Sequence, residues 1–223
     1  MPPEPRPAAD PPRTLVIACG ALAPELVALT RRPGLSHVDL ACLPPDLHDR
    51  PEHIPAAVRR RIRAARTTHD HIFVAYADCG TGGLLDGVLR EEGIERLPGA
   101  HCYQVFAGQD AFDELMAQEP ATFFLTDFLA RHFDRLVVRG LGLDRHPELL
   151  AVYFGAYRRV VYLAQTDDPR LLAAARAAAA RLGLAFELRR TGYGDLATAI
   201  EALAGVADVS AVRAALPVAT GAA

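Results

Sequence analysis

The stretch TLVIACGALAPELVALTRR, residues 14–32, contains the repeating unit from which the fold is predicted. Residues 14–19 are rich in apolar and β-branched side chains, which favours a strand, and a helical pattern follows over 21–32. The same alternation of short strands and helices continues along the chain, and it is typical of a mostly parallel sheet covered by helices on both faces. We therefore expect an α/β protein with a doubly wound, Rossmann-like sheet.

The remaining elements follow from the same patterns. Further strands are expected over 37–42, 71–79, 93–97, 121–126, 159–166 and 184–190, and further helices over 52–66, 82–92, 109–118, 126–138, 145–155, 168–181 and 194–204. The stretch 98–108 interrupts the alternation, so we expect an irregular loop there. The Pro-rich residues 1–12 predict a disordered arm and the Ala-rich residues 205–223 a loose tail. Residues 13–204 are expected to fold as a single α/β domain, with two lobes as the alternative.

Composition excludes several classes of function. The chain has 223 residues and a formal net charge of −3, and all 24 of its basic residues are arginine. Without lysine, Schiff-base catalysis, pyridoxal-phosphate attachment and a Walker-type phosphate site are excluded. The slightly acidic balance argues against nucleic acid or a membrane surface as the partner, and no apolar run is long enough to cross a bilayer. The N-terminus lacks the apolar segment of a signal peptide, so we expect a cytoplasmic protein with reduced thiols.

The cysteines follow the expected strands. Cys19, Cys42 and Cys79 end the first three strands, and Cys102 lies in the loop after the fourth. The carboxyl ends of parallel strands share one edge of the sheet, and ligands bind in the crevice outside that edge. We therefore expect several thiols to converge there. Cys19 and Cys79 each precede a glycine and a helix, whose N-terminal amides are expected to lower the pKa of the thiol.

The alternative for any single cysteine is packing, because cysteine is among the most buried residue types. For Cys42 we favour packing, whereas Cys19, Cys79 and Cys102 together favour metal ligation. His48 follows the second strand on the same edge, and His101 precedes Cys102. Either histidine could complete a tetrahedral zinc site, and His48 could instead serve as an acid–base group.

Other candidates are the glycines of DCGTGG, residues 78–83, and Asp127. The amides of Gly80, Gly82 and Gly83 could bind an anion, or these glycines could let the backbone approach a metal or substrate. Asp127 follows the fifth strand, where a carboxylate acts either as a general base or as a helix cap.

Five segments of the chain resemble the domain-of-unknown-function family numbered 1638: LVIACG (15–20), LPPDLHDRP (43–51), YADCGTGG (76–83), GAHCYQVFAG (99–108) and TFFLTDFL (122–129). The resemblance extends from about residue 14 to about residue 200. Members of this largely uncharacterised family occur in bacteria and methanogenic archaea, often encoded near corrinoid-dependent methyltransferases for methylated amines. The resemblance therefore implies a role in methyl-group metabolism. Its motifs fall on Cys19, His48, Cys79, His101 and Cys102. One turn departs from the family pattern, because Ala77 stands where a glycine is expected.

These observations predict a soluble zinc-binding enzyme that acts on a small molecule. Zinc would either activate water for hydrolysis or bind a thiolate for group transfer such as methyl transfer. One alternative is a metal-free enzyme with Cys79 as nucleophile and His48 or His101 as base. Another is a non-catalytic accessory protein that binds a corrinoid methyltransferase component. A DxHxxG-type corrinoid motif is absent from the sequence, so any corrinoid is expected only through such a partner.

Overall fold

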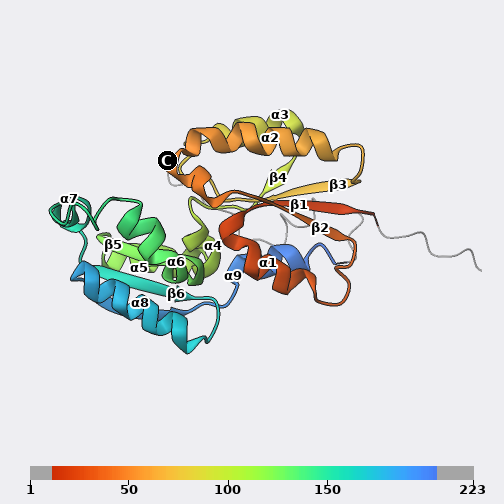
Figure 1. Ribbon diagram of the computed structural model, residues 1–223. Helices are drawn as coiled ribbons and strands as arrows, with labels where there is room; N and C mark the ends of the chain where they lie inside the picture. Colours follow the sequence, from red (N-terminus) through yellow and green to blue (C-terminus); the bar gives the residue numbers. More distant parts are fainter. Residues whose placement is uncertain (1–11, 205–223) are drawn as a thin grey trace, which may run out of the picture.

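The computed structural model describes residues 12–204, so the expected arm (apart from residue 12) and the expected tail lie outside the described residues. Seven strands are present in this part of the chain, and they form two sheets (Figure 1). The first sheet has the order β2-β1-β3-β4 and the second the order β5-β6-β7. Their bounds are β1 Thr14–Cys19, β2 Val38–Leu43, β3 His71–Ala75, β4 Glu95–Arg96, β5 Thr122–Leu125, β6 Arg159–Ala164 and β7 Ala185–Arg190.

Every strand pair is parallel. The α/β class with parallel sheets is thus confirmed, with the strands divided between two sheets where the sequence suggested one.

Helices cover the first sheet on both faces. Figure 1 shows α2 and α3 on one face and α1 and α9 on the other, while α6 and α8 pack together beside the second sheet. The α-helices are α1 Ala23–Thr30, α2 Ile54–Ala65, α3 Leu84–Glu92, α4 Cys102–Ala107, α5 Gln109–Gln118, α6 Asp127–Phe133, α7 Leu149–Phe154, α8 Pro169–Leu182 and α9 Gly194–Glu201. Short 3₁₀ turns are η1 Gly20–Leu22, η2 Pro45–Asp49 and η3 Pro51–His53, and the π-helical segment η4 spans Asp134–Arg139.

The two sheets share a hydrophobic core through β6. Val160 and Tyr162 face a core formed with α6 and α8, whereas Val161 and Leu163 face the core of the first sheet. This division follows from the two-residue period of a strand, which points successive side chains to opposite faces. Because one face of the second sheet completes the first core, the sheets are packed into one body.

The structure corrects several expected boundaries. The third strand ends at Ala75 instead of residue 79, because the backbone of residues 78 and 79 pairs with residues 99 and 100 outside the sheet. The stretch 98–108 is not wholly irregular, since α4 begins at Cys102 and buries Val105 and Phe106. The helix expected over 126–138 changes to π-helical geometry at Asp134, and the helix expected over 145–155 is limited to α7.

Candidate thiol site

The candidate site lies at the carboxyl edge of the first sheet, between β1 and β3. In the order β2-β1-β3-β4 the chain leaves β1 in one direction for β2 and returns to the other side of β1 for β3. Such a change of direction is the place where open α/β sheets generally bind their ligands, outside the strand ends. Cys19 is the last residue of β1, and Cys79 follows β3 after four residues. The expected adjacency of these two strands is therefore present.

Cys19 is 4% exposed and its position is fixed by the start of η1. Its Sγ accepts a hydrogen bond from the Ala21 amide at 3.3 Å, so the thiol caps the turn that follows the strand. Burial raises the pKa of Cys19 to about 12, and this outweighs the lowering by the Ala21 amide. The expected activation of this thiol by a helix N-terminus is thus not observed.

Cys79 has an unusual backbone conformation. Its φ of +51° makes it the one non-glycine residue with positive φ in the described part of the chain. A residue with a Cβ pays about 1–2 kcal/mol for this conformation, and such strain clusters at functional sites. The strain is held by two backbone hydrogen bonds, from the Cys79 amide to the Ala100 carbonyl (2.8 Å) and from the Asp78 amide to the Gly99 carbonyl (3.0 Å).

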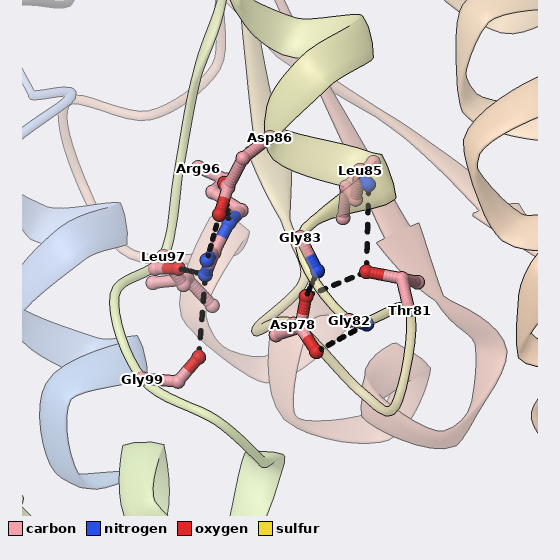
Figure 2. Close-up of polar contacts among 9 residues, drawn as sticks. All are labelled: Asp78, Thr81, Gly82, Gly83, Leu85, Asp86, Arg96, Leu97 and Gly99. Atoms are coloured by element: carbon pink, nitrogen blue, oxygen red, sulfur yellow. Dashed lines mark hydrogen bonds and ion pairs between the residues drawn. The ribbon is translucent and has the colours of Figure 1, made fainter. Parts of the chain in front are cut away.

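Asp78 organises the turn that carries Cys79 (Figure 2). Its carboxylate accepts hydrogen bonds from the Thr81 hydroxyl (2.6 Å) and from the amides of Gly82 (3.0 Å) and Gly83 (2.9 Å). Burial alone would raise the pKa of Asp78, but these hydrogen bonds and the nearby Arg96 lower it. The Gly82 and Gly83 amides, expected to bind an anion, thus donate to a carboxylate of the chain itself. Gly80 also has positive φ, at +82°.

Arg96 ties this turn to the segment that leads to Cys102 (Figure 2). Its Nε and Nη2 donate to the two carboxylate oxygens of Asp86 in α3, at 2.6 and 3.0 Å. Its Nη1 donates to the carbonyls of Leu97 (2.6 Å) and Gly99 (3.3 Å). The Arg96 side chain is only 16% exposed, so this network supports the loop on which both cysteines depend.

Cys102 begins α4 next to Cys79. The preceding turn is closed by Gln104, whose side-chain oxygen accepts the Ala100 amide at 2.9 Å. Burial raises the pKa of Cys79 to about 11, and this outweighs the lowering by the backbone amides of Ala77 and Cys102 and by Arg96. Burial, then the thiols of Cys79 and Cys19, raise the pKa of Cys102 further. Cys19, Cys79 and Cys102 thus converge, and all three thiols are protonated at neutral pH.

Cys42 lies at the border of the cluster, near enough for its thiol to act on Cys19 and Tyr76. It is exposed on β2, so it is not the buried packing residue that the sequence favoured.

His48 approaches the thiols from η2. Its Nδ1 lies 3.1 Å from the Pro45 carbonyl oxygen and 3.8 Å from Cys19 Sγ. A carbonyl only accepts, so Nδ1 carries the proton and Nε2 keeps its lone pair. The ring stacks on Tyr76 with the centroids 6.3 Å apart and 13° between the planes. Burial lowers the pKa of His48, which favours the neutral imidazole.

Two further groups border the cluster. Tyr76 is 1% exposed, and its buried hydroxyl interacts with the Cys19 thiol and lies near that of Cys79. His101 is exposed and precedes α4, where it contributes to lowering the pKa of His48. The sequence did not indicate Tyr76, Asp78 or Arg96, although an aspartate three residues before a threonine in a glycine-rich turn is a recognisable turn signal.

Asp127 lies in a different environment. It is 4% exposed at the start of α6, where it accepts hydrogen bonds from the Tyr162 hydroxyl (2.6 Å), the Gln165 amide (3.1 Å) and the Thr166 hydroxyl (2.5 Å). The helix cap is Thr126, whose side chain accepts the Leu129 amide. The hydrogen bonds of the Asp127 carboxylate are therefore with β6 and the residues after it, and the structure does not bring Asp127 to the thiols.

Within residues 12–204, no three His, Cys, Asp or Glu side chains are arranged closely enough to hold a metal ion as they stand. A metal at the thiol cluster would have to draw the three sulfur atoms together by rotation about their Cα–Cβ bonds. Over the same described residues, no helix is long and apolar enough to cross a membrane.

Comparison with known families identifies one relationship. A family model described as "Protein of unknown function (DUF1638)" matches residues 42–200, so the chain belongs to this family. The expected resemblance is confirmed, but the match begins after Cys19 instead of at about residue 14. His48, Cys79, His101 and Cys102 lie inside it. Neither the curated proteins nor the solved structures contain a significant match.

Proposed function

For this DUF1638 protein we propose that Cys19, Cys79 and Cys102 bind a thiophilic metal ion, zinc, and that the resulting site acts on a small molecule. The observation that carries the proposal is the convergence of three thiols at the switch point of a parallel sheet. One of these thiols lies on a strained turn that a separate network of Asp78 and Arg96 supports. Packing alone requires neither the strain nor the network.

The donor set fits zinc. With Zn–S near 2.3 Å and Zn–N near 2.0 Å, two ligands of a tetrahedral ion lie about 3.5 Å apart. The His48 Nδ1 lies 3.8 Å from Cys19 Sγ, so the imidazole is beside this thiol, although Nδ1 itself is bonded to Pro45 and the ligand would be Nε2. The buried hydroxyl of Tyr76 lies beside the Cys19 thiol, where it can donate to the thiolate that forms on metal binding. Zinc binding would replace the protons of the buried thiols, because the metal ligand is the thiolate.

His48 is prepared for one of two roles. Metal-ligating histidines usually donate the other ring N–H to a carbonyl or carboxylate, and His48 makes such a bond to Pro45. Its Nε2 is thus either the fourth ligand or a base that takes a proton from a bound substrate. When bound, zinc would supply either an activated water or a nucleophilic thiolate. The burial of Cys19 and Tyr76 excludes bulk water from one side of this site.

A metal-free nucleophilic Cys79 has less support. Reactive cysteines have a lowered pKa, whereas burial raises that of Cys79 to about 11. The imidazole nearest a thiol, His48, contacts Cys19 instead. A non-catalytic accessory role in methyl metabolism is the remaining alternative, and it predicts partner binding without turnover of a small substrate.

Cobalt substitution tests the proposal. The full chain, treated with chelator and loaded with one equivalent of Co²⁺, should develop a thiolate-to-cobalt absorption band. Each single substitution Cys19→Ser, Cys79→Ser or Cys102→Ser should reduce that band by at least one third, because three thiolates contribute to it, and a variant that no longer holds the metal should lose the band entirely. Cys42→Ser is the matched control and should leave it unchanged. Equal bands in all four variants, or no band in the wild type, would refute the site.

A further inference from the structure

A second cavity lies where the first turns of α1 and α6 meet, between the two sheets. Its volume is about 60 Å³, which holds an ion with a few waters or a molecule of a few heavy atoms. The groups that line it include two carboxylates, one guanidinium and two aromatic rings, from Glu25, Asp127, Arg131, Phe128 and Tyr193. None of the residues that line this cavity belongs to the thiol cluster.

Glu25 is the unusual member of this set. It is 4% exposed, and its Oε2 makes no hydrogen bond. A buried carboxylate oxygen without a donor is costly, and native proteins rarely leave one without a ligand, water or ion. The unpartnered oxygen of Glu25 therefore indicates that a donor enters the cavity.

Asp127 differs because its oxygens already have donors. The Tyr162 hydroxyl and the Gln165 amide bond Oδ1, and the Thr166 hydroxyl bonds Oδ2. Asp127 is thus held in place as a fixed neighbour of Glu25. Burial raises the pKa of Glu25 to about 7 with a smaller contribution from Asp127, while the Glu25 backbone amide and then Arg131 oppose the rise.

We propose that this cavity binds a small organic monocation of the ammonium class, whose N–H group donates to Glu25 Oε2 and whose carbon atoms contact Phe128 and Tyr193. Two carboxylates and one guanidinium leave one negative charge for the ligand to balance. An anion would meet both carboxylates, and a divalent cation needs more oxygen ligands than one free oxygen supplies. Aromatic rings favour an organic cation further.

Binding of this kind requires an ionised Glu25. The groups that set its charge are Asp127 and Arg131 on α6, and Tyr193 is the other titratable group that lines the cavity. Helix α9 also packs against α1, but Glu201 pairs with Arg32 and Asp195 lines a different cavity. With a pKa of about 7, Glu25 is about one tenth ionised at pH 6 and about nine tenths ionised at pH 8.

Titration calorimetry of the full chain with ethylammonium chloride tests the proposal. The affinity should be about ninefold higher at pH 8 than at pH 6. Ethanol, which has the ethyl group without the charge, should not bind, and potassium should bind at least tenfold more weakly than ethylammonium. Equal affinity at both pH values, or equal binding of ethanol or potassium, would overturn the proposal.

Variants locate the binding. Glu25→Gln should weaken ethylammonium binding at pH 8 by at least tenfold. Asp167→Asn is the matched control, because Asp167 is an exposed carboxylate one residue from Thr166, and its variant should bind as the wild type does. Undiminished binding by Glu25→Gln would place the site elsewhere and refute the assignment. If that variant does not fold, the ninefold pH ratio in the wild type decides the matter by itself.

Discussion

The pH dependence of zinc affinity follows directly from the state of the three thiols. Burial raises the pKa of Cys19 to about 12, that of Cys79 to about 11 and that of Cys102 further still, so each thiol carries its proton near pH 7. The pKa of His48 is lowered by burial, so its imidazole contributes no proton in this range. Zinc binding through three thiolates should therefore release about three protons.

The number of released protons sets how steeply zinc affinity changes with pH. Below the thiol pKa values, each released proton changes the apparent affinity tenfold per pH unit, which is about 1.4 kcal/mol. Three protons give about 1,000-fold, or about 4 kcal/mol, for each pH unit. Since protons compete with the metal, affinity should rise by this factor as the pH rises from 6.5 to 7.5.

The assay is competition with a chromophoric chelator of known affinity at pH 6.5, 7.0 and 7.5. The wild type should give a slope near three in a plot of log affinity against pH, and Cys102→Ser a slope near two. Cys42→Ser should keep the wild-type slope. A slope near zero or one in the wild type would refute ligation by three buried, protonated thiols.

Three further predictions concern stability. Cys79→Gly should unfold at higher denaturant concentration than Cys79→Ala, by about 1 kcal/mol, because only glycine adopts the φ of +51° without strain; equal midpoints would exclude strain at this position. Arg96→Met should destabilise the chain by about 1–3 kcal/mol and weaken zinc binding. Arg63→Met, at a side chain 64% exposed, is the control and should cost less than about 1 kcal/mol of stability. Similar losses of stability in both variants would contradict a supporting role for Arg96. The raised pKa of Glu25 means that its contribution to stability is present below its unfolded value of 4.5 and is lost as the pH rises to about 7, by about 3 kcal/mol. Thermal unfolding of Glu25→Gln should lack this component over the same range, and a pH profile identical to that of the wild type would refute the assignment.

Hydrophobic patterning was sufficient to predict the parallel α/β architecture and the positions of most elements. β1 is buried along its whole length and ends at Cys19, as the apolar run over 14–19 indicated. Patterning could not show that the strands divide into two sheets, because both faces of β6 are buried and the sequence does not reveal which core each face joins. It also could not end β3 at Ala75, since residues 76 and 77 are as buried as the strand itself.

The residues of the thiol site were also predictable in part from the expected strands. Strand ends and sequence neighbours indicated Cys19, Cys79, Cys102 and His48, because parallel strands bring their carboxyl ends to one edge. The pKa of each thiol was not predictable, since it depends on burial, which outweighs the amide that caps it. Asp127 was expected as a general base or a helix cap at a strand end, but the sequence could not show that its strand belongs to the second sheet, because a position at a strand end does not specify the sheet.

The zinc content of the purified protein tests the central claim most directly. The full chain, produced in zinc-supplemented medium and purified without a metal-affinity tag, should contain about one zinc per chain by plasma mass spectrometry. Cys79→Ser should lose that zinc, while Cys42→Ser should retain it. A wild-type protein with well under one metal ion per chain, or a Cys79→Ser variant with as much zinc as the wild type, would contradict ligation by the thiol cluster.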